Sequence, residues 1–347
     1  MIQFDIASVV RQVGRFGIGE NQTLSGKDGT PGFQSIPGAD ARTPSEFSLS
    51  SFRLAAEGAR KTDAPGFRHI GVVGAGVIGS GVAQLFAQTG HDVVLIDIRP
   101  DQLDRARRDI ARNLKLYNLL QPNRQQAGDP LAHLHFSSTT TALADMDFVI
   151  ENVTEDWELK RRVHLEIDDL VAASAPVAAN TSAIPITRIA GVGRHPQRVV
   201  GMHFMNPVPL MPMVEVIRGV HTSEDTISAA RTLLEQAGRQ SITVNDSPGF
   251  VTNRVMMLMV NEAMFLVHEG VASAQDVDRL LKTCFGHKMG PLETADLIGL
   301  DTVLKSIEVI LAETNDDKYR PCPLLKSKVY AGMYGRKSGE GFYKYDL

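Results

Sequence analysis

The chain has 347 residues, of which 43% are hydrophobic and 22% are charged, a composition typical of globular proteins with enough apolar residues for a core. Its length predicts about two or three domains. A net charge of −4 gives no reason to expect nucleic acid or an anionic membrane surface as a partner. No apolar run approaches the ~20 residues that a membrane span requires, and no secretory signal is recognisable at the N-terminus. The two cysteines are too few for a disulfide framework or a metal site, and they indicate a reducing cytoplasm.

The first 66 residues differ in composition from the rest of the chain. They are rich in Gly, Ser, Pro and Thr and show little sustained periodicity. Such a segment buries too little apolar surface to offset the entropy lost on ordering. We therefore expect an N-terminal extension over 1–66, mostly flexible at 15–50, with short helices at 5–13 and 50–60. A mitochondrial transit peptide is less favoured, because acidic residues are as frequent here as basic ones.

From His69 onward the sequence alternates between apolar strands and helices. The first two strands, HIGVVG and DVVLID, are continuous apolar runs of the kind buried in parallel sheets. Helices are expected at 77–90 and 157–172, between strands. This alternation predicts an α/β fold with a Rossmann-type, doubly wound parallel sheet. The expected strands are residues 69–74, 92–97, 134–137, 147–152, 176–180 and 198–204.

The strands stop after the segment SPGF, which ends at Phe250. We therefore place a domain boundary near residue 246. The predicted organisation is an extension at 1–66, a sheet domain at 67–246 and an all-helical C-terminal domain at 247–347. Helices are expected in the last of these at 251–270, 275–285, 291–299, 301–314 and 323–333.

A glycine-rich turn lies between the first strand and the helix that follows it. The segment GAGVIG matches G-x-G-x-x-G, in which Gly74 permits the tight turn, Gly76 lets the backbone approach a pyrophosphate and Gly79 permits close helix–strand packing. The helix N-terminus offers unpaired N–H groups and a partial positive charge to the phosphates. Asp97, at the end of the second strand, can accept hydrogen bonds from the adenosine ribose, so the turn predicts a dinucleotide. The acid favours NAD by repelling a 2′-phosphate, whereas Arg99 leaves NADP open as the alternative.

A histidine and a glutamate stand in an otherwise apolar segment, GMHFMNPVPLMPMVEVI. His203 closes a predicted strand, and Glu215 lies in MVEVI, which can run back beside that strand after a proline-rich turn. Lone polar groups in apolar surroundings cost free energy unless they have a partner, so we predict that the two side chains form a hydrogen bond. A carboxylate that accepts from one ring nitrogen fixes the histidine tautomer and raises its basicity. That combination suits a general base for an alcohol proton.

Three further polar residues lie where such a site would form. Ser182, in ANTSAIP, comes just after a predicted strand, where ligands of open α/β sheets bind. Asn206 follows His203 in a turn fixed by proline. Asn253, in SPGFVTNRV, begins the first helix of the second domain, and taken alone it is better explained as a helix cap.

Together these segments resemble the short-chain 3-hydroxyacyl-CoA dehydrogenase family, which includes the bacterial 3-hydroxybutyryl-CoA dehydrogenases. The resemblance extends from His69 to Leu347, and several separate motifs in one order are far more specific than the glycine turn alone. The motifs are GAGVIGSGVAQLFAQTGHDVVLID, ANTSAIPIT, GMHFMNPVPLMPMVEVI, DSPGFVTNRV, MGPLETADLIGLD and GRKSGEGFYKY.

The resemblance implies an activity and a role for each residue. The reaction would be reversible hydride transfer between NAD and the 3-carbon of a short 3-hydroxyacyl thioester, in a homodimer formed by the helical domain. His203 would be the general base, with Glu215 as its partner. Without the resemblance, Glu155 and Lys160 in ENVTEDWELK would be interpreted as an exposed pair at a helix start. The residues that would hold the reacting oxygen are Ser182 and Asn253, and those that would contact the nicotinamide half of NAD are Glu155, Lys160 and Asn206.

One stretch departs from the family pattern. The family usually has a polar or basic helical hairpin after the second strand, with a lysine that touches coenzyme A. The matching stretch here, ARNLKLYNLLQPNRQQAG, is apolar in its middle. Lys115 and Arg124 remain, but the usual basic position is Leu120 or Gln121. The acyl carrier is therefore open between coenzyme A and an acyl carrier protein, and the apolar LYNLL would either pack on the domain or dock that protein.

Two alternatives to a coenzyme A-dependent enzyme follow. One is a dehydrogenase that acts on a hydroxyacyl group carried by an acyl carrier protein in polyketide extender-unit biosynthesis. The other, from another class, is a non-catalytic NAD-binding protein of the crystallin type. That protein would not need a serine, a histidine, a glutamate and an asparagine together, so an enzyme is favoured.

Overall fold

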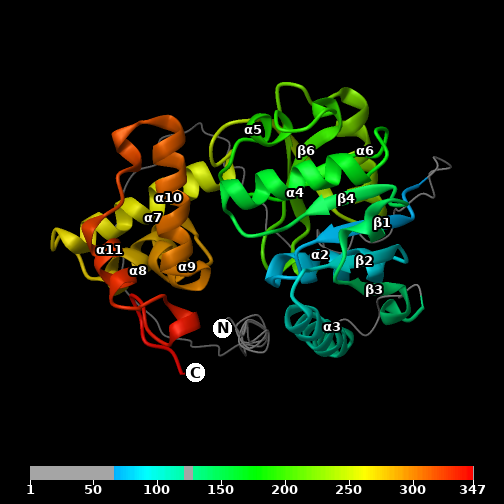
Figure 1. The fold of residues 1–347 in the computed structure, drawn as a ribbon. Helices are drawn as coiled ribbons and strands as arrows, with labels where there is room; N and C mark the ends of the chain where they lie inside the picture. The colour runs from blue at the N-terminus through cyan, green and yellow to red at the C-terminus, as the bar shows by residue number, and fades with distance from the viewer. Residues whose placement is uncertain (1–65, 121–127, 347) are drawn as a thin grey trace, which may run out of the picture. The chain divides into compact units, whose positions relative to one another are not determined.

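The structure is a computed structural model that describes residues 66–120 and 128–346, without the side chains of 118–120. The helices expected at 5–13 and 50–60 and the flexible segment expected at 15–50 lie outside these residues. So do Gln121 and Arg124 of the stretch that departs from the family. Within the described residues, a sheet with flanking helices is followed by a helical part, drawn in yellow to red in Figure 1.

The first part of the described chain is built on an eight-stranded sheet with the order β3-β2-β1-β4-β5-β6-β7-β8. Neighbouring strands pair in parallel, except that β7 runs antiparallel to β6. The order from β3 to β6 is that of a Rossmann-type doubly wound sheet, so the predicted fold class is confirmed. The strands are β1 (His69–Val73), β2 (Asp92–Ile96), β3 (Leu134–Ser137), β4 (Phe148–Glu151), β5 (Val177–Ala179), β6 (Val199–His203), β7 (Met213–Arg218) and β8 (Gln240–Asn245).

The strands expected from the sequence are all present, with ends that differ by at most one residue. The return strand expected over MVEVI is β7. The edge strand β8 was not expected. None of its residues is buried, so it lacks the apolar run that identifies the other strands.

Helices cover both faces of this sheet, because side chains along a strand point to alternate faces. Ile70 and Val72 of β1 pack in one core with Phe86 of α2 and with side chains of α3 and α6. Val73 packs on the opposite face with Ile167 of α4. Burial on both faces explains why these strands are apolar throughout. The helices are α2 (Val77–Gln88), α3 (Pro100–Leu120), α4 (Trp157–Leu170), α5 (Ile186–Ala190) and α6 (Glu224–Gln236), the last two of which were not expected.

The helical part begins a few residues after the sheet ends. Its helices share one apolar core that includes Met257, Leu292, Ile307 and Leu325. No helix in the two described ranges is both long and apolar enough to cross a membrane. The helices, whose ends lie within three residues of those expected, are α7 (Thr252–His268), α8 (Ala274–Phe285), α9 (Pro291–Ile298), α10 (Leu300–Thr314) and α11 (Pro323–Tyr330).

Two buried aspartates close the helical part. The Asp278 carboxylate accepts from the Leu292 and Glu293 N–H groups at 2.8 and 2.9 Å and so caps the start of α9. The Asp296 carboxylate accepts from the N–H groups of Phe342 and Tyr343, both at 2.9 Å, and holds the C-terminal segment on α9. The motifs MGPLETADLIGLD and GRKSGEGFYKY therefore serve packing within this part.

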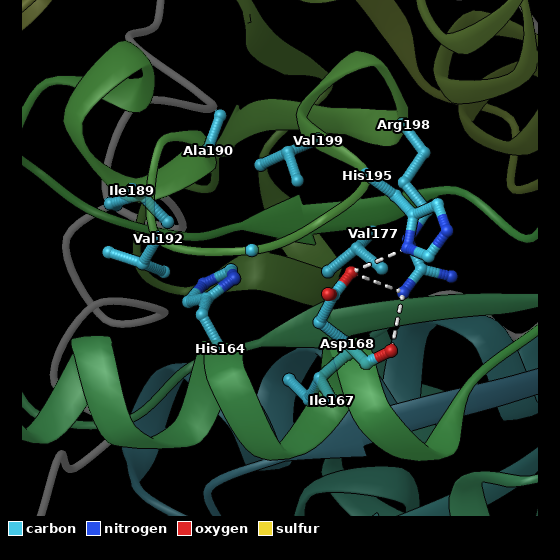
Figure 2. Close-up of a pocket in the computed structure, with 11 residues that line it drawn as sticks. His164, Ile167, Asp168, Val177, Ile189, Ala190, Val192, His195, Arg198 and Val199 are labelled. Atoms are coloured by element: carbon cyan, nitrogen blue, oxygen red, sulfur yellow. Dashed lines mark hydrogen bonds and ion pairs between the residues drawn. The ribbon is translucent and has the colours of Figure 1, made fainter. Parts of the chain in front are cut away.

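A third aspartate ties α4 to the loop before β6 (Figure 2). Asp168 accepts from the Arg194 N–H at 2.7 Å, and its Oδ1 lies 3.0 Å from both His195 Nδ1 and Arg198 Nη2. Arg198 is 4% exposed and also donates to the carbonyl of Val171, just past the end of α4. Burial by itself raises the pKa of the Asp168 carboxyl, but these hydrogen bonds hold it well below its ordinary value.

We expect Asp168→Asn to lower the free energy of unfolding by about 2–4 kcal/mol at pH 7, because Arg198 would lose its buried anion. The folded-state pKa is depressed, so this stabilisation is present above the unfolded-state pKa of about 3.9 and is lost as the pH falls toward the folded-state value. Urea unfolding at pH 7 and pH 3 measures both effects, and the gap between variant and wild type should narrow at pH 3.

The matched control is Asp169→Asn. Asp169 is 73% exposed and pairs with Arg194, which is 66% exposed. Its loss should change the free energy of unfolding by less than about 0.5 kcal/mol. Equal stability of the Asp168 and Asp169 variants at pH 7 would show that the cluster does not stabilise the fold.

Candidate active site

The glycine turn follows β1 and opens α2. Gly74 has a φ of +98°, and a Cβ there would lie 2.7 Å from the Asn152 carbonyl oxygen. A Cβ on Gly79 would lie 1.8 Å from the Gly74 carbonyl oxygen. These two glycines are therefore required by the fold itself. A Cβ on Gly76 would meet nothing within 4 Å, so no neighbour in the structure accounts for this glycine.

The start of α2 is open to an anion. Gly76 caps the helix without a side-chain hydrogen bond, and no acidic residue lies in the first turn. Asp97, directly after β2, accepts from the Ala75 N–H at 3.0 Å and from the Arg99 N–H at 3.0 Å. The turn is thus held from the side by a carboxylate, while its N–H groups at the helix start remain available to a phosphate.

Ser182 lies in a turn after β5 that Glu155 holds in place. The Oε1 atom of Glu155 accepts from Thr181 Oγ1 at 2.6 Å and from the N–H groups of Ser182 and Ala183 at 3.1 and 3.0 Å. Its other oxygen accepts no hydrogen bond from a described residue. Glu155 is therefore half-buried and bound to the turn, and its interpretation as an exposed residue at a helix start is wrong.

Lys160 is fully buried beneath this turn. Its ammonium lies 2.9 and 3.0 Å from the two Glu151 oxygens and donates to the Asn180 carbonyl at 2.9 Å. His164 Nε2 lies 3.1 Å from the same carboxylate. Burial raises the pKa of Glu151, but Lys160 and His164 outweigh it and hold the pKa below its ordinary value. The structure places Lys160 inside this cluster, and its interpretation as an exposed residue is also wrong.

The antiparallel pair β6–β7 brings His203 and Glu215 directly opposite each other. His203 Nδ1 lies 3.2 Å from Glu215 Oε2. The two side chains are 4% and 6% exposed. The predicted hydrogen bond is confirmed, and it arises because opposite residues of an antiparallel pair point to the same face.

The Glu215 carboxylate also binds the start of α7. Its Oε1 accepts from the Val251 N–H at 2.8 Å, and its Oε2 accepts from Thr252 Oγ1 at 2.7 Å. Burial raises the pKa of Glu215, but the hydrogen bonds from His203, Thr252 and Val251 outweigh it and hold the pKa below its ordinary value. An ionised Glu215 requires the proton of a neutral His203 ring to be on Nδ1, which leaves Nε2 as a free acceptor.

Asn253 does not cap α7, so the interpretation as a helix cap is wrong. The cap position is Val251, which has no side-chain cap, and the Asn253 amide instead donates to the Ser182 carbonyl at 3.0 Å. Asn253 and Ser182 are thus brought together. The Ser182 hydroxyl makes no hydrogen bond with a described residue. Asn206 is exposed, three residues after His203.

Two polar residues of this region were missed from the sequence. The Asn180 amide donates to Asn152 Oδ1 at 2.8 Å, and its Oδ1 accepts from the Phe204 N–H at 3.2 Å, so it links the ends of β4, β5 and β6. Thr252, directly before Asn253, binds Glu215. Neither gives a signal in the sequence, because asparagine after a strand and threonine at a helix start are both ordinary.

The carboxyl ends of the parallel strands therefore carry two kinds of chemistry. One is an uncapped helix start that suits a phosphate, and the other is a buried histidine with a defined tautomer and a free nitrogen. A hydroxyl and an amide lie after β5 and at the start of α7. Such a set can remove a proton from an alcohol.

Known proteins are similar to this chain in sequence and in fold. A protein of Deinococcus radiodurans named "Probable 3-hydroxybutyryl-CoA dehydrogenase" is 44% identical over 275 residues, which is 79% of this chain and 99% of that protein. The 3-hydroxybutyryl-CoA dehydrogenase of Bradyrhizobium diazoefficiens is 41% identical over 279 residues, 80% of this chain and 95% of that protein. The crystal structure of (S)-3-hydroxybutyryl-CoA dehydrogenase from Ralstonia eutropha superimposes with a TM-score of 0.76 at 41% identity, and covers 81% of this chain and 100% of that one.

Two family models match successive parts of the sequence. The model for the NAD binding domain of 3-hydroxyacyl-CoA dehydrogenase matches residues 69–247, and the model for the C-terminal domain of the same enzyme matches residues 249–345. Together they span the sheet and the helices that follow it. The chain therefore belongs to the 3-hydroxyacyl-CoA dehydrogenase family of NAD-dependent oxidoreductases.

Proposed function

We propose that the chain interconverts a short 3-hydroxyacyl-CoA and its 3-oxoacyl form, with a 3-hydroxybutyryl group as the acyl chain. The observation that carries this proposal is the buried His203–Glu215 pair, whose free ring nitrogen suits a general base for an alcohol. The names of the relatives support the short acyl group. A substrate of this kind belongs to fatty acid metabolism.

In this proposal His203 takes the hydroxyl proton at Nε2. The hydrogen bond from Nδ1 to Glu215 keeps the ring in the tautomer whose Nε2 carries the lone pair. When the ring gains the proton it becomes an imidazolium, and the carboxylate at 3.2 Å stabilises that charge. The same pair returns the proton in the reverse direction.

Ser182 and Asn253 would hold the oxygen at the 3-position of the substrate. One N–H of the Asn253 amide is used by the Ser182 carbonyl, which leaves its second N–H for a ligand. The Ser182 hydroxyl is likewise available. Donors fixed in place before the reaction stabilise the charge that develops on this oxygen as the bond order changes.

The glycine turn would hold NAD, which supplies the hydride acceptor. The open space at Gly76 and the uncapped start of α2 support a pyrophosphate at this position, and Asp97 supports the adenosine ribose. Gly74 and Gly79 would shape the turn. Arg99 Nε lies 3.7 Å from Asp97 Oδ1, so its charge is directed to that acid, which favours NAD over NADP.

Glu155, Lys160 and Asn206 would serve the nicotinamide half of the cofactor. Glu155 keeps one oxygen free of hydrogen bonds to the described residues, and Asn206 is exposed. Lys160 is bound to Glu151, so it would act on the cofactor through the Asn180 carbonyl or after leaving its cluster.

We also propose a cytoplasmic homodimer with a domain boundary after residue 246. The two family models support the boundary, since one ends at 247 and the other begins at 249. Exposed apolar side chains of the helical part, such as Val255 (64%) and Phe285 (73%), support a contact between helical domains. The free thiols of Cys284 and Cys322 support a reducing compartment.

The helix α3 supports coenzyme A as the acyl carrier. Tyr117 of LYNLL is buried and donates to the Pro209 carbonyl at 3.0 Å, so this part of the apolar stretch packs on the sheet part and is not free to dock a protein. Basic side chains are exposed on the same helix and suit the phosphates of coenzyme A. They are Arg105, Arg107, Arg108, Arg112 and Lys115.

A first prediction separates the two kinds of glycine. Gly76→Ala should keep the fold and weaken NADH binding by about tenfold or more, because its Cβ would enter the space left for the pyrophosphate. Gly79→Ala should destabilise the protein, because its Cβ overlaps the Gly74 carbonyl. NADH titration by fluorescence and thermal unfolding measure the two effects. Wild-type affinity in Gly76→Ala would rule out this position for the cofactor.

A second prediction concerns the base and its partner. His203→Gln should bind NADH normally and lose turnover by on the order of 10²–10⁴. Glu215→Gln should lose a similar factor, since its NH₂ group must face donors from either His203 or α7. Steady-state oxidation of 3-hydroxybutyryl-CoA measures both. Near-normal turnover in folded His203→Gln would refute the proposed mechanism.

A third prediction concerns the carrier. The kcat/KM for one hydroxyacyl group should be at least about tenfold higher on coenzyme A than on pantetheine, because the exposed basic side chains of α3 would bind its phosphates. Arg108→Gln should narrow this difference, whereas Arg231→Gln on α6 should not. If an acyl carrier protein were the better substrate by tenfold, with coenzyme A equal to pantetheine, the carrier-protein alternative would replace this proposal.

A further inference from the structure

Thr252 forms a closed triangle with the histidine and the glutamate. Its Oγ1 lies 2.7 Å from Glu215 Oε2 and 3.3 Å from His203 Nδ1, and the third side of the triangle measures 3.2 Å. The three side chains come from α7, β7 and β6. The first residue of a helix therefore touches both members of a pair that lies on two strands.

The protons of this triangle can be arranged in one way only. An ionised Glu215 accepts at both of its oxygens, so the Thr252 hydroxyl donates to Oε2. The His203 Nδ1–H also points to Oε2, and the lone pairs of Thr252 Oγ1 face that same N–H at longer range. The hydroxyl thus shares one carboxylate oxygen with the ring.

We propose that Thr252 is a positioning residue that sets the orientation and basicity of His203 through Glu215. This inference rests on the proposed function of His203 as the base. Because Oε2 accepts from Thr252, it has less charge to offer the imidazolium, so the ring gives up its proton at a lower pH than it would beside an unshared carboxylate.

The backbone of the same residue fixes the carboxylate in rotation. The Thr252 N–H lies 3.4 Å from Glu215 Oε1, while its hydroxyl binds Oε2. The Val251 N–H holds Oε1 at 2.8 Å. Both oxygens are therefore held by the start of α7, and the side that faces the ring cannot turn away without breaking these bonds.

Glu215 is the charged group in contact with the ring, and the charged side chains on neighbouring elements are engaged elsewhere. Arg188 of α5 pairs with Glu313, and Arg254 of α7 donates to Ser247 and Tyr319. Asp246 accepts from the backbone at the start of α5. The charged residues of α6, which packs on β6, are exposed. They are Glu224, Asp225, Arg231 and Glu235.

The test is the pH dependence of kcat/KM in the oxidation direction, whose acidic limb reports the base of the free enzyme. Thr252→Val keeps the branched shape and removes the hydroxyl. Its acidic limb should move to higher pH by about 0.3–1 unit, because Glu215 would then support the imidazolium more strongly. Thr252→Ser keeps the hydroxyl and should restore the limb to the wild-type position.

The control is Thr283→Val, in which the lost hydroxyl donates to the Arg279 carbonyl on α8. It should leave the limb in place, and all variants should bind NADH like the wild type. A limb that stays in place or moves to lower pH in Thr252→Val overturns the inference. His203→Gln is measured alongside. If it is inactive and the limb does not move, this inference alone fails; if it retains turnover, the proposed function fails with it.

Discussion

The arrangement of His203 and the start of α7 depends on one buried carboxylate. Glu215 is 6% exposed, and a charge in such a place is costly unless every lone pair finds a donor. Its donors come from β6 through His203 and from the start of α7 through Val251 and Thr252. The antiparallel return of β7 puts the acid opposite the histidine, and the first N–H groups of α7 need an acceptor from elsewhere because the residue at the cap position, Val251, offers no side-chain acceptor. The carboxylate on β7 thus receives its donors from β6 and α7, and both β6 and α7 receive an acceptor from β7.

Other carboxylates at the carboxyl ends of the strands also accept from several donors on neighbouring elements. Glu151 is fully buried and is offset by Lys160 and His164, and Glu155 gathers a hydroxyl and the N–H groups of the turn that carries Ser182. A carboxylate that accepts several fixed donors cannot rotate freely. The polar groups of this edge are therefore held in place before any ligand binds, which is the condition under which hydrogen-bond donors contribute most to a reaction.

The sequence predicts what depends on local pattern and misses what depends on tertiary contacts. Continuous apolar runs predict strands such as β1 to within a residue. The His203–Glu215 contact is predictable because the two strands that carry these residues are joined by the short turn MNPVPLMP, and a hairpin pairs residues that are near in sequence. The edge strand β8 is absent from the prediction because it buries nothing. Local sequence alone places Lys160 and Asn253 wrongly for one reason: a residue near a helix start is expected to face solvent or to cap its own helix, whereas each here binds a group on another element. Thr252 could not be identified at all, since its partner is 37 residues away.

The docking of α7 and the chemical state of His203 are consequently coupled. The ionised form of Glu215 accepts from the helix start and also accepts the proton on Nδ1; a protonated Glu215 would lose acceptor capacity for both. Any interaction that favours α7 in its bound position must therefore also favour the ionised form of Glu215 and the His203 tautomer with a free Nε2, because the binding of α7 and the tautomer of His203 depend on the same carboxylate. Since Asn253 is the next residue of that helix and binds the Ser182 carbonyl, seating α7 also sets the second set of donors. A histidine with a fixed tautomer and its neighbouring amide are thus assembled by the same contact.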